Sequence, residues 1–182
     1  MRNYLLIIAF MMSSCTNENA GDEGLKNTSK NISIRVSVDS SELILETRID
    51  SNKINNTVSI KQMLIFKQNG HQIAQSPSPI IANNKVFTHE DSITVLDNVI
   101  YEIGALKGGK GNLFTIYGAG SCNACPELVA FYNQSGKCVW LNYSNASKVY
   151  KSIGDFTKEL NTYGIDSTKW FNKDYRRVTV DL

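Results

Sequence analysis

Short stretches in which apolar and polar residues alternate dominate this chain. In Ile32–Val38, ISIRVSV, isoleucine and valine occupy every second position, with serine and arginine between them. Leu43–Asp50 repeats the pattern, and Val58–Lys67 is a third such stretch that becomes more apolar toward its end. Successive side chains of a strand point to opposite faces, so a period of two indicates a strand with one buried and one wet face. These stretches therefore predict antiparallel strands.

Turn signals separate the expected strands. Asn69-Gly70 stands between Val58–Lys67 and a return strand at Gln72–Gln75, and Asn-Gly is the strongest short-range signal for a β-hairpin. Further short strands are expected at Lys85–Thr88, Ser92–Leu96, Val99–Ala105 and Leu113–Tyr117, and at the C-terminus, where Val178, Val180 and Leu182 alternate. This regular return of short strands is typical of all-β sandwiches and barrels.

One convincing helix is expected near the C-terminus. Asp155 is a candidate N-cap for its second part, Gly164 has the residue type that ends a helix, and Asp166 can cap a short turn beyond it. The apolar residues are spaced 4, 3, 4 and 3 apart, as one helical stripe requires: Val149, Ile153, Phe156, Leu160 and Tyr163. The predicted fold class is mainly β (α+β), an antiparallel β-sandwich or open barrel with this one C-terminal helix packed on it.

Residues 32–182 are expected to form a single β-rich domain. A domain of about 150 residues buries roughly 70% of its extended-chain surface and can build a core without cross-links. The formal charge of the whole chain is +2, from 19 basic and 17 acidic residues. The charges are interspersed and form no basic stripe, so the sequence predicts no nucleic-acid partner.

The N-terminus has the composition of an export signal. Arg2 precedes the apolar run Tyr4–Met12, whose nine residues are too few for a membrane span of about 20. The following Met12-Ser13-Ser14-Cys15 resembles the bacterial lipobox, in which small residues precede a cysteine that becomes lipidated. The resemblance implies that residues 1–14 are a signal peptide and that Cys15 carries acyl chains such as palmitate. An ordinary secreted protein with a free Cys15 is the alternative.

The lipobox resemblance also implies a location. Thr16 follows the cysteine where an Asp is associated with retention at the inner membrane, so the implied address is the outer membrane, with a periplasmic or a surface-facing domain both open. Residues 16–31 contain one large apolar residue, Leu25, and cannot bury enough surface to order themselves. We therefore predict that residues 15–31 are a flexible tether and that the protein contacts the membrane through its N-terminal lipid.

The pair Cys122 and Cys125 forms a CxxC motif with three interpretations. A disulfide fits an oxidising compartment, although so short a loop gains only about 2 kcal/mol. A strand before the motif and Pro126–Tyr132 after it resemble the strand, CxxC and helix order of the thioredoxin family, which implies a redox pair. A metal site would need further ligands, and Cys138, His71 and His89 stand at no telling spacing.

The segment after the motif is better explained as a β-hairpin than as a helix. Its halves, ELVAFY and KCVWLNY, are rich in strand formers, and NQSG between them is a turn sequence. If Tyr132 and Lys137 flank this turn, Cys138 lies opposite Phe131 and shares a face with Trp140. We interpret Cys138 as a buried thiol that acts as a small hydrophobe.

No catalytic constellation, metal site or cofactor motif is apparent in the sequence. The leading hypothesis is a lipid-anchored envelope protein that acts as a non-enzymatic binding or interaction module, and the sequence does not identify a protein partner. The chain resembles small Bacteroidota-type lipoproteins. One alternative is a thiol-disulfide oxidoreductase that uses Cys122 and Cys125. A second alternative is an immunity-type inhibitor lipoprotein that neutralises a protein.

Overall fold

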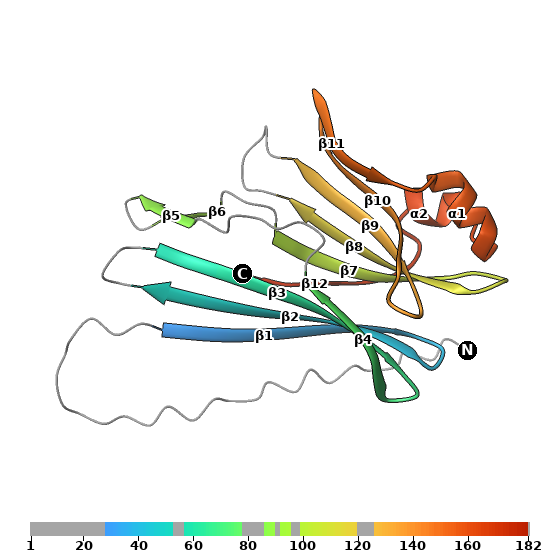
Figure 1. The fold of residues 1–182 in the computed structure, drawn as a ribbon, viewed down its shortest axis with the longest axis horizontal. Coiled ribbons are helices and arrows are strands. Elements are labelled where there is room, and N and C mark those ends of the chain that lie inside the picture. The colour runs from blue at the N-terminus through green and yellow to red at the C-terminus, as the bar shows by residue number, and fades with distance from the viewer. Residues whose placement is uncertain are drawn as a thin grey trace, which may run out of the picture.

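Two antiparallel sheets face each other in the structure (Figure 1). It is a computed structural model that describes residues 28–52, 57–77, 86–89, 92–95, 99–119 and 126–181. Every strand pairing in both sheets is antiparallel. The predicted β-sandwich class is confirmed, and the alternation seen in the sequence is its cause.

The first sheet has the order β1-β2-β3-β5-β6, and β4 also pairs with β3. Its strands are β1 Thr28–Val38, β2 Ser41–Asn52, β3 Thr57–Gln68, β4 His71–Pro77, β5 Val86–His89 and β6 Ser92–Val95. The second sheet has the order β11-β10-β9-β8-β7-β12. Its strands are β7 Val99–Lys107, β8 Asn112–Ala119, β9 Glu127–Asn133, β10 Cys138–Asn145, β11 Lys148–Ile153 and β12 Arg176–Thr179. A strand near the C-terminus is thus present as an edge of this sheet, but it ends at Thr179, and Leu182 lies outside the described residues.

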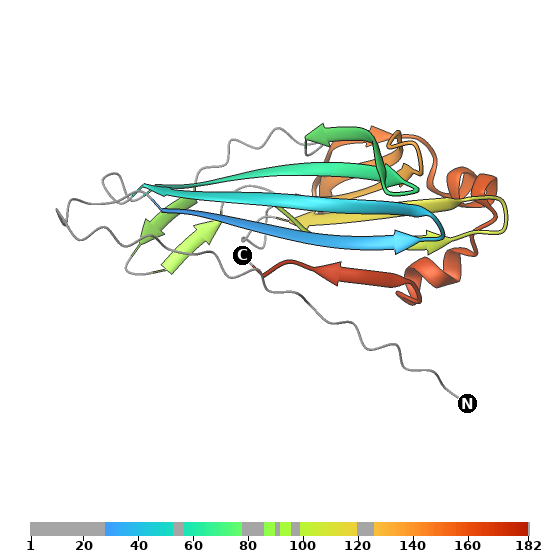
Figure 2. The same ribbon diagram turned by 90° about the horizontal axis from the view of Figure 1, so that it is seen from below.

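The core lies between the inner faces of the two sheets. Its largest side chains are fully buried and come from both layers: Leu43, Leu45, Leu64 and Phe66 from the first sheet, and Ile103, Phe114, Ile116 and Leu128 from the second. β12 contacts β1 as well as β7, so the two sheets also meet along one side (Figure 2).

The predicted tether is wrong for its last four residues, and residues 15–27 lie outside the described residues. β1 begins at Thr28, so residues 28–31 belong to the sheet and not to a flexible segment. Thr28 is aligned with Ser51, and the Ser29 hydroxyl donates a 2.8 Å hydrogen bond to the Asp50 carboxylate. The long partner strand β2 supplies main-chain pairing that the polar composition of this stretch does not indicate.

The predicted helix is partly wrong, because its first half is the strand β11. Val149 and Ile153 lie on this strand, and the side chain of Asn145 forms the turn that leads into it. The Asn145 Oδ1 atom accepts hydrogen bonds from the backbone N–H groups of Ser147 and Lys148, at 3.1 and 2.9 Å. A local polar turn therefore starts a hairpin where the apolar spacing indicated a helix.

Two short helices follow among the described residues, α1 Phe156–Tyr163 and α2 Ser167–Phe171. The predicted caps are confirmed. Asp155 accepts a hydrogen bond from the Lys158 N–H at the start of α1, and Gly164 ends that helix with a φ of 63°. Asp166 caps α2 through the Thr168 N–H. Together the helices cover part of the outer face of the second sheet (Figure 1).

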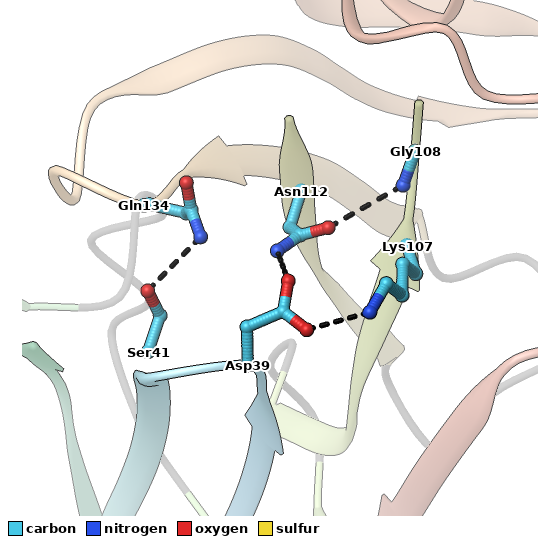
Figure 3. Close-up of polar contacts among 6 residues, drawn as sticks. All are labelled: Asp39, Ser41, Lys107, Gly108, Asn112 and Gln134. Atoms are coloured by element: carbon cyan, nitrogen blue, oxygen red, sulfur yellow. Dashed lines mark hydrogen bonds and ion pairs between the residues drawn. The ribbon is translucent and has the colours of Figure 1, made fainter. Parts of the chain in front are cut away.

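A group of polar side chains joins the two sheets at their turn ends (Figure 3). The Asp39 carboxylate, in the β1–β2 turn, accepts hydrogen bonds from Lys107 Nζ at 2.6 Å and from Asn112 Nδ2 at 2.7 Å. Nearby, Gln134 Nε2 donates a 3.0 Å hydrogen bond to the Ser41 hydroxyl. We call these five residues the inter-sheet clasp. Asn112 is only 4% exposed, so its Nδ2 group depends on Asp39 of the clasp for a partner.

The clasp makes the stability of the protein depend on pH. Hydrogen bonds from Lys107 and then Asn112 hold the pKa of Asp39 below its usual value of 3.8. Because its pKa is lowered on folding, ionised Asp39 stabilises the folded state fully when the pH is above the pKa that Asp39 has in the unfolded chain. This stabilisation is lost as the pH falls through the pKa that Asp39 has in the folded protein. The Asp39→Ala variant should therefore melt at a lower temperature than the wild type at pH 7, and the difference should shrink below about pH 4.

Asp174→Ala is the matched control, because Asp174 is an exposed aspartate outside the clasp. Circular dichroism melts from pH 7 to pH 2 would measure both variants. A difference between Asp39→Ala and wild type that stays constant over this range would show that the clasp does not act through the ionised carboxylate.

Candidate functional site

The second sheet carries apolar side chains on its outer face as well as on its inner face. Toward the turn end of the sheet, α1 and α2 cover this outer face and form a second cluster of buried residues. The cluster contains Leu106, Leu113, Phe131, Leu160 and Ile165, with Trp140, Phe156 and Trp170 packed against it. Phe131 lies in the middle of the aromatic rings, with ring centroids 4.8 Å from Trp140, 5.7 Å from Phe156 and 5.0 Å from Trp170.

Beyond the helices, the outer face of the second sheet is open and forms a groove of about 540 Å³. Side chains of three neighbouring strands provide the floor, and the α2 segment with the residues after it provides a wall. The lining residues are Tyr101, Glu102, Tyr117, Val129, Trp170, Phe171, Lys173 and Tyr175. This volume lies in the range of small-molecule sites, and the aromatic lining with a few polar groups is typical of them. We call this concavity the aromatic groove.

A β-bulge in β7 places Tyr101 in the groove. The register between β7 and β8 shifts there, because Ile100 is aligned with Gly118 and Glu102 with Tyr117. Ile100 and Ile103 both point into the inner core. The two residues between them, Tyr101 and Glu102, therefore both face outward, which regular alternation forbids. Bulges re-aim side chains in this way and are common beside functional sites.

Gln62 of the first sheet fixes the main chain just before this bulge. Its Nε2 donates to the carbonyl oxygen of Ile100 at 2.6 Å, and its Oε1 accepts from the N–H of Ile100 at 2.7 Å. One side chain thus satisfies both main-chain groups of Ile100, as buried backbone requires. The position of Tyr101 therefore depends on contact between the two sheets.

Tyr175 holds the wall of the groove against the sheet. Its ring stacks on Trp170 with a centroid distance of 5.4 Å and an interplanar angle of 15°. The ring lies so close to Gly104 of β7 that a Cβ atom there would stand 2.6 Å from Tyr175 Cε2 and 2.5 Å from Thr115 Oγ1. Only glycine leaves this space on the outer face of β7.

The charges at the groove are largely paired. Glu102 accepts a 3.0 Å hydrogen bond from Arg177 Nη1, and the side chain of Glu102 is only 13% exposed. The Arg177 guanidinium also lies over the Tyr175 ring, 5.8 Å from its centroid. Burial, and then the charge of Glu102, raises the pKa of Tyr175 to about 12. Its hydroxyl therefore stays neutral at physiological pH.

The two tyrosines of the sheet contact each other. Tyr101 and Tyr117 meet edge to face, with centroids 5.0 Å apart and an angle of 89°. Burial raises the pKa of Tyr117, and hydrogen bonds with Tyr101 and Glu127 raise it further. Tyr117 thus presents a neutral, protonated phenol to the groove, together with an aromatic ring.

The structure places the predicted buried thiol away from this groove. Cys138 is half-buried at the margin of the inner core, its Sγ lies 3.5 Å from the Trp140 carbonyl oxygen, and burial raises its pKa. The predicted register is wrong, because Cys138 is aligned with Tyr132 and not with Phe131. A bulge between Cys138 and Trp140 adds one residue, so the two side chains lie on opposite faces of the sheet.

The other predicted site residues, Cys15, Cys122 and Cys125, lie outside the described residues, so their predicted roles stay predictions. The segment directly after the CxxC motif is described, and it is the strand β9, Glu127–Asn133. It is therefore not the helix that the thioredoxin-like resemblance implies. Within the described ranges, no three His, Cys, Asp or Glu side chains gather as ligands of a metal ion would.

Sequence reasoning did not find the aromatic groove. Its residues are far apart in the chain, because four strands, β8 to β11, and the helix α1 lie between Tyr101 and Trp170. The one local signal is the run Val99–Ile103, VIYEI, where apolar residues at three positions fail to alternate. Such a break is what a bulge produces.

Comparisons with protein families, with curated proteins and with solved structures give no match for this chain. Across the described part of the chain, none of the helices has the length and apolar character needed to cross a membrane.

Gly104→Ala is expected to destabilise the fold and to displace Tyr175 from the groove wall. The added Cβ would overlap Thr115 and Tyr175, and such overpacking costs on the order of 1–3 kcal/mol. Urea unfolding measures the loss of stability, and near-ultraviolet circular dichroism reports the stacked Trp170 and Tyr175 rings.

Gly109→Ala is the control for this variant, because a Cβ at Gly109 would meet only one atom, at 3.8 Å. It should have the stability and the spectrum of the wild type. Equal stability of the two alanine variants would mean that Tyr175 does not pack on Gly104 as described.

Proposed function

We propose that this chain is a lipid-anchored envelope protein that acts as a non-enzymatic binding module, and that the aromatic groove is its ligand site. The observation that carries this proposal is a large exposed aromatic side chain beside a preformed concavity. Phe171 at the groove is 68% exposed, whereas Phe156 and Trp170 beside it are half-buried against the second cluster. A fold that exposes such surface gives up burial energy, and an exposed apolar patch next to a pocket is typical of a binding site.

The chemistry of the groove favours binding over catalysis. Its lining consists mainly of aromatic rings and phenol groups, which stack and form hydrogen bonds. The most buried charged group, Glu102, is paired with Arg177 and is not poised beside a nucleophile or a second acid. Such a lining holds a ligand in place without transferring a proton or forming a bond with it.

The position of the groove suits a protein held by its N-terminus. The described fold begins with β1 of the first sheet, and the second sheet forms the other layer (Figure 1). The groove lies on the outer face of that second sheet. A lipid on Cys15 would join the domain through β1, which leaves the opposite layer free for a ligand. The proposed outer-membrane location rests on the lipobox resemblance alone.

A second hollow, on the outer face of the first sheet, is a weaker candidate. It has a volume of about 500 Å³ and its lining includes Glu46, Arg48 and Lys61. The Arg48 guanidinium is already bound to Asp50, at 2.8 and 3.0 Å. No aromatic ring lines this hollow, so it offers less surface for a ligand.

An immunity-type inhibitor function, with a protein partner, has one observation in its favour. β11 is an edge strand whose side chains are all exposed, among them Val149 and Tyr150. An open edge can accept a strand from another protein. However, Lys148 and Lys151 stand on the same strand, and lysines are a common protection of edges against such pairing. The aromatic groove is therefore the preferred site.

The binding function predicts that a ligand stabilises the protein through the groove. The protein is purified in a detergent without sugar groups and melted with four probe classes, namely neutral oligosaccharides, choline, decanoate and acidic peptides. A ligand at 100 times its Kd adds about 2.7 kcal/mol to the free energy of unfolding, which raises Tm by several degrees. Mass spectrometry of the bound probe should show that it is unchanged.

Phe171→Ser is the test variant, and Val149→Ser is its control, because both side chains are exposed but only Phe171 lines the groove. The rise in Tm should be lost in the first variant and kept in the second. The proposal fails if no probe class raises Tm, or if the bound probe is chemically converted.

The lipid anchor predicts that Cys15 carries an acyl group. Cells that express the full chain are fed an alkyne analogue of palmitate, and the protein should be labelled and should sediment with the membranes. The Cys15→Ala variant should lose the label, whereas Cys138→Ala, which changes the half-buried thiol, should keep it. Label that persists in Cys15→Ala would refute lipidation at that residue.

A further inference from the structure

We propose that the ligand of the aromatic groove is a neutral saccharide. This inference rests on the proposed binding function and names the ligand class for the same site. It follows from three properties of the lining residues, which are their ring surfaces, their balance of charge and the polar atoms between the rings.

The ring surfaces suit a flat ligand that has an apolar side. The rings come from two directions, Tyr101 and Tyr117 from the sheet and Trp170 and Phe171 from the α2 segment. A pyranose ring has faces made of C–H groups and an edge made of hydroxyl groups. The C–H faces carry slight positive charge and pack on the negative faces of aromatic rings, while the hydroxyl edge remains available for hydrogen bonds.

The balance of charge disfavours an ionic ligand. A cation would be attracted by the ring faces, but it would stand near Lys173 and Arg177. An anion would stand near Glu102 and Glu127, of which the first is bound to Arg177 and the second to Tyr117. Because Glu102 and Arg177 neutralise each other, the groove has no strong unmatched charge deep inside. A neutral ligand loses no ionic hydration when it enters.

The polar atoms disfavour a purely apolar ligand. The hydroxyl groups of Tyr101 and Tyr117 and the carboxylate of Glu102 lie among the rings of the groove. Tyr117 already hydrogen-bonds with Tyr101 and Glu127, and Glu102 with Arg177, but an acyl chain offers these groups no further hydrogen bond in place of water. Sugar hydroxyls both donate and accept, so one sugar edge can satisfy phenols and a carboxylate together.

The structure therefore assigns Phe171 the role of a stacking platform and Tyr117 the role of a ring that also hydrogen-bonds. Phe171 has no polar atom and is the most exposed ring of the groove. Tyr117 lies on the sheet and is held by Tyr101 and Glu127. The two residues provide separate tests, because one variant removes a ring and another removes only a hydroxyl group.

Isothermal titration calorimetry on the protein in sugar-free detergent tests this inference. The neutral probes are the hexamers of β-1,4-linked glucose, α-1,4-linked glucose and β-1,4-linked N-acetylglucosamine, and choline and decanoate represent the other classes. At least one hexamer should bind with 1:1 stoichiometry. The three hexamers distinguish the possible sources of the sugar. The two glucose hexamers represent a plant-type and a storage glucan, and the N-acetylglucosamine hexamer represents an amino-sugar polymer of a cell wall.

The variants locate the bound sugar. Phe171→Ala should weaken the binding of that hexamer roughly tenfold or more, as the loss of an aromatic hot spot does. Tyr117→Phe keeps the ring and should cause a smaller loss, and Tyr117→Ala a larger one. Val149→Ala, on the exposed strand β11, should bind as the wild type does.

Each outcome separates the ligand class from the binding function. Binding of a hexamer that Phe171→Ala weakens supports both proposals. Binding of choline or decanoate alone overturns the saccharide inference and leaves the groove as a binding site. Hexamer binding that neither Phe171→Ala nor Tyr117→Ala weakens overturns the inference as well. Absence of binding by every probe would overturn both proposals.

Discussion

The structure depends on the need to cover both faces of the second sheet. Its strand β8 is buried on both sides, with Phe114 and Ile116 facing the first sheet and Leu113 facing the helices. A sheet of this kind cannot have one wet face, because water on either side would expose large apolar side chains. The helices α1 and α2 are short, at eight and five residues, and they cover only part of the outer face. The aromatic groove is the part that they leave open.

Two β-bulges decide what the outer face of this sheet contains. In β7 the bulge turns Tyr101 outward beside Glu102, and in β10 a second bulge turns Val139 and Trp140 outward together. The first lines the groove, and the second widens the surface on which α1 packs. Since Gln62 of the first sheet binds the main chain of Ile100, the inner contact between the sheets also sets the outer surface. Contacts within the core thus hold the floor of the groove in place.

The sequence was sufficient for those features that depend on neighbouring residues. The alternation of apolar and polar residues located the strands, and Asn69-Gly70 located the β3–β4 hairpin. The two ends of α1 were located by Asp155 and Gly164. It was insufficient where a distant partner decides the outcome. Val149 and Ile153 match a helical stripe equally well, but pairing with β10 makes them part of a strand. Cys138 was assigned to the face of Trp140 because a bulge adds a residue that regular alternation does not count.

The groove was not predicted for the same reason, because contacts between distant parts of the chain form both its floor and its wall. Its floor is set by sheet pairing, whereas its wall is set by Tyr175, which stacks on Trp170 and fits over Gly104. The wall segment is a five-residue helix capped by Asp166, too short to be stable without packing. Tyr175 therefore couples the width of the groove to the glycine beneath it. A site whose floor is held by the core and whose wall is held by one stacked ring is suited to select a ligand by its shape. A ligand made of rings meets this selection better than a flexible chain, because it loses less conformational freedom on binding.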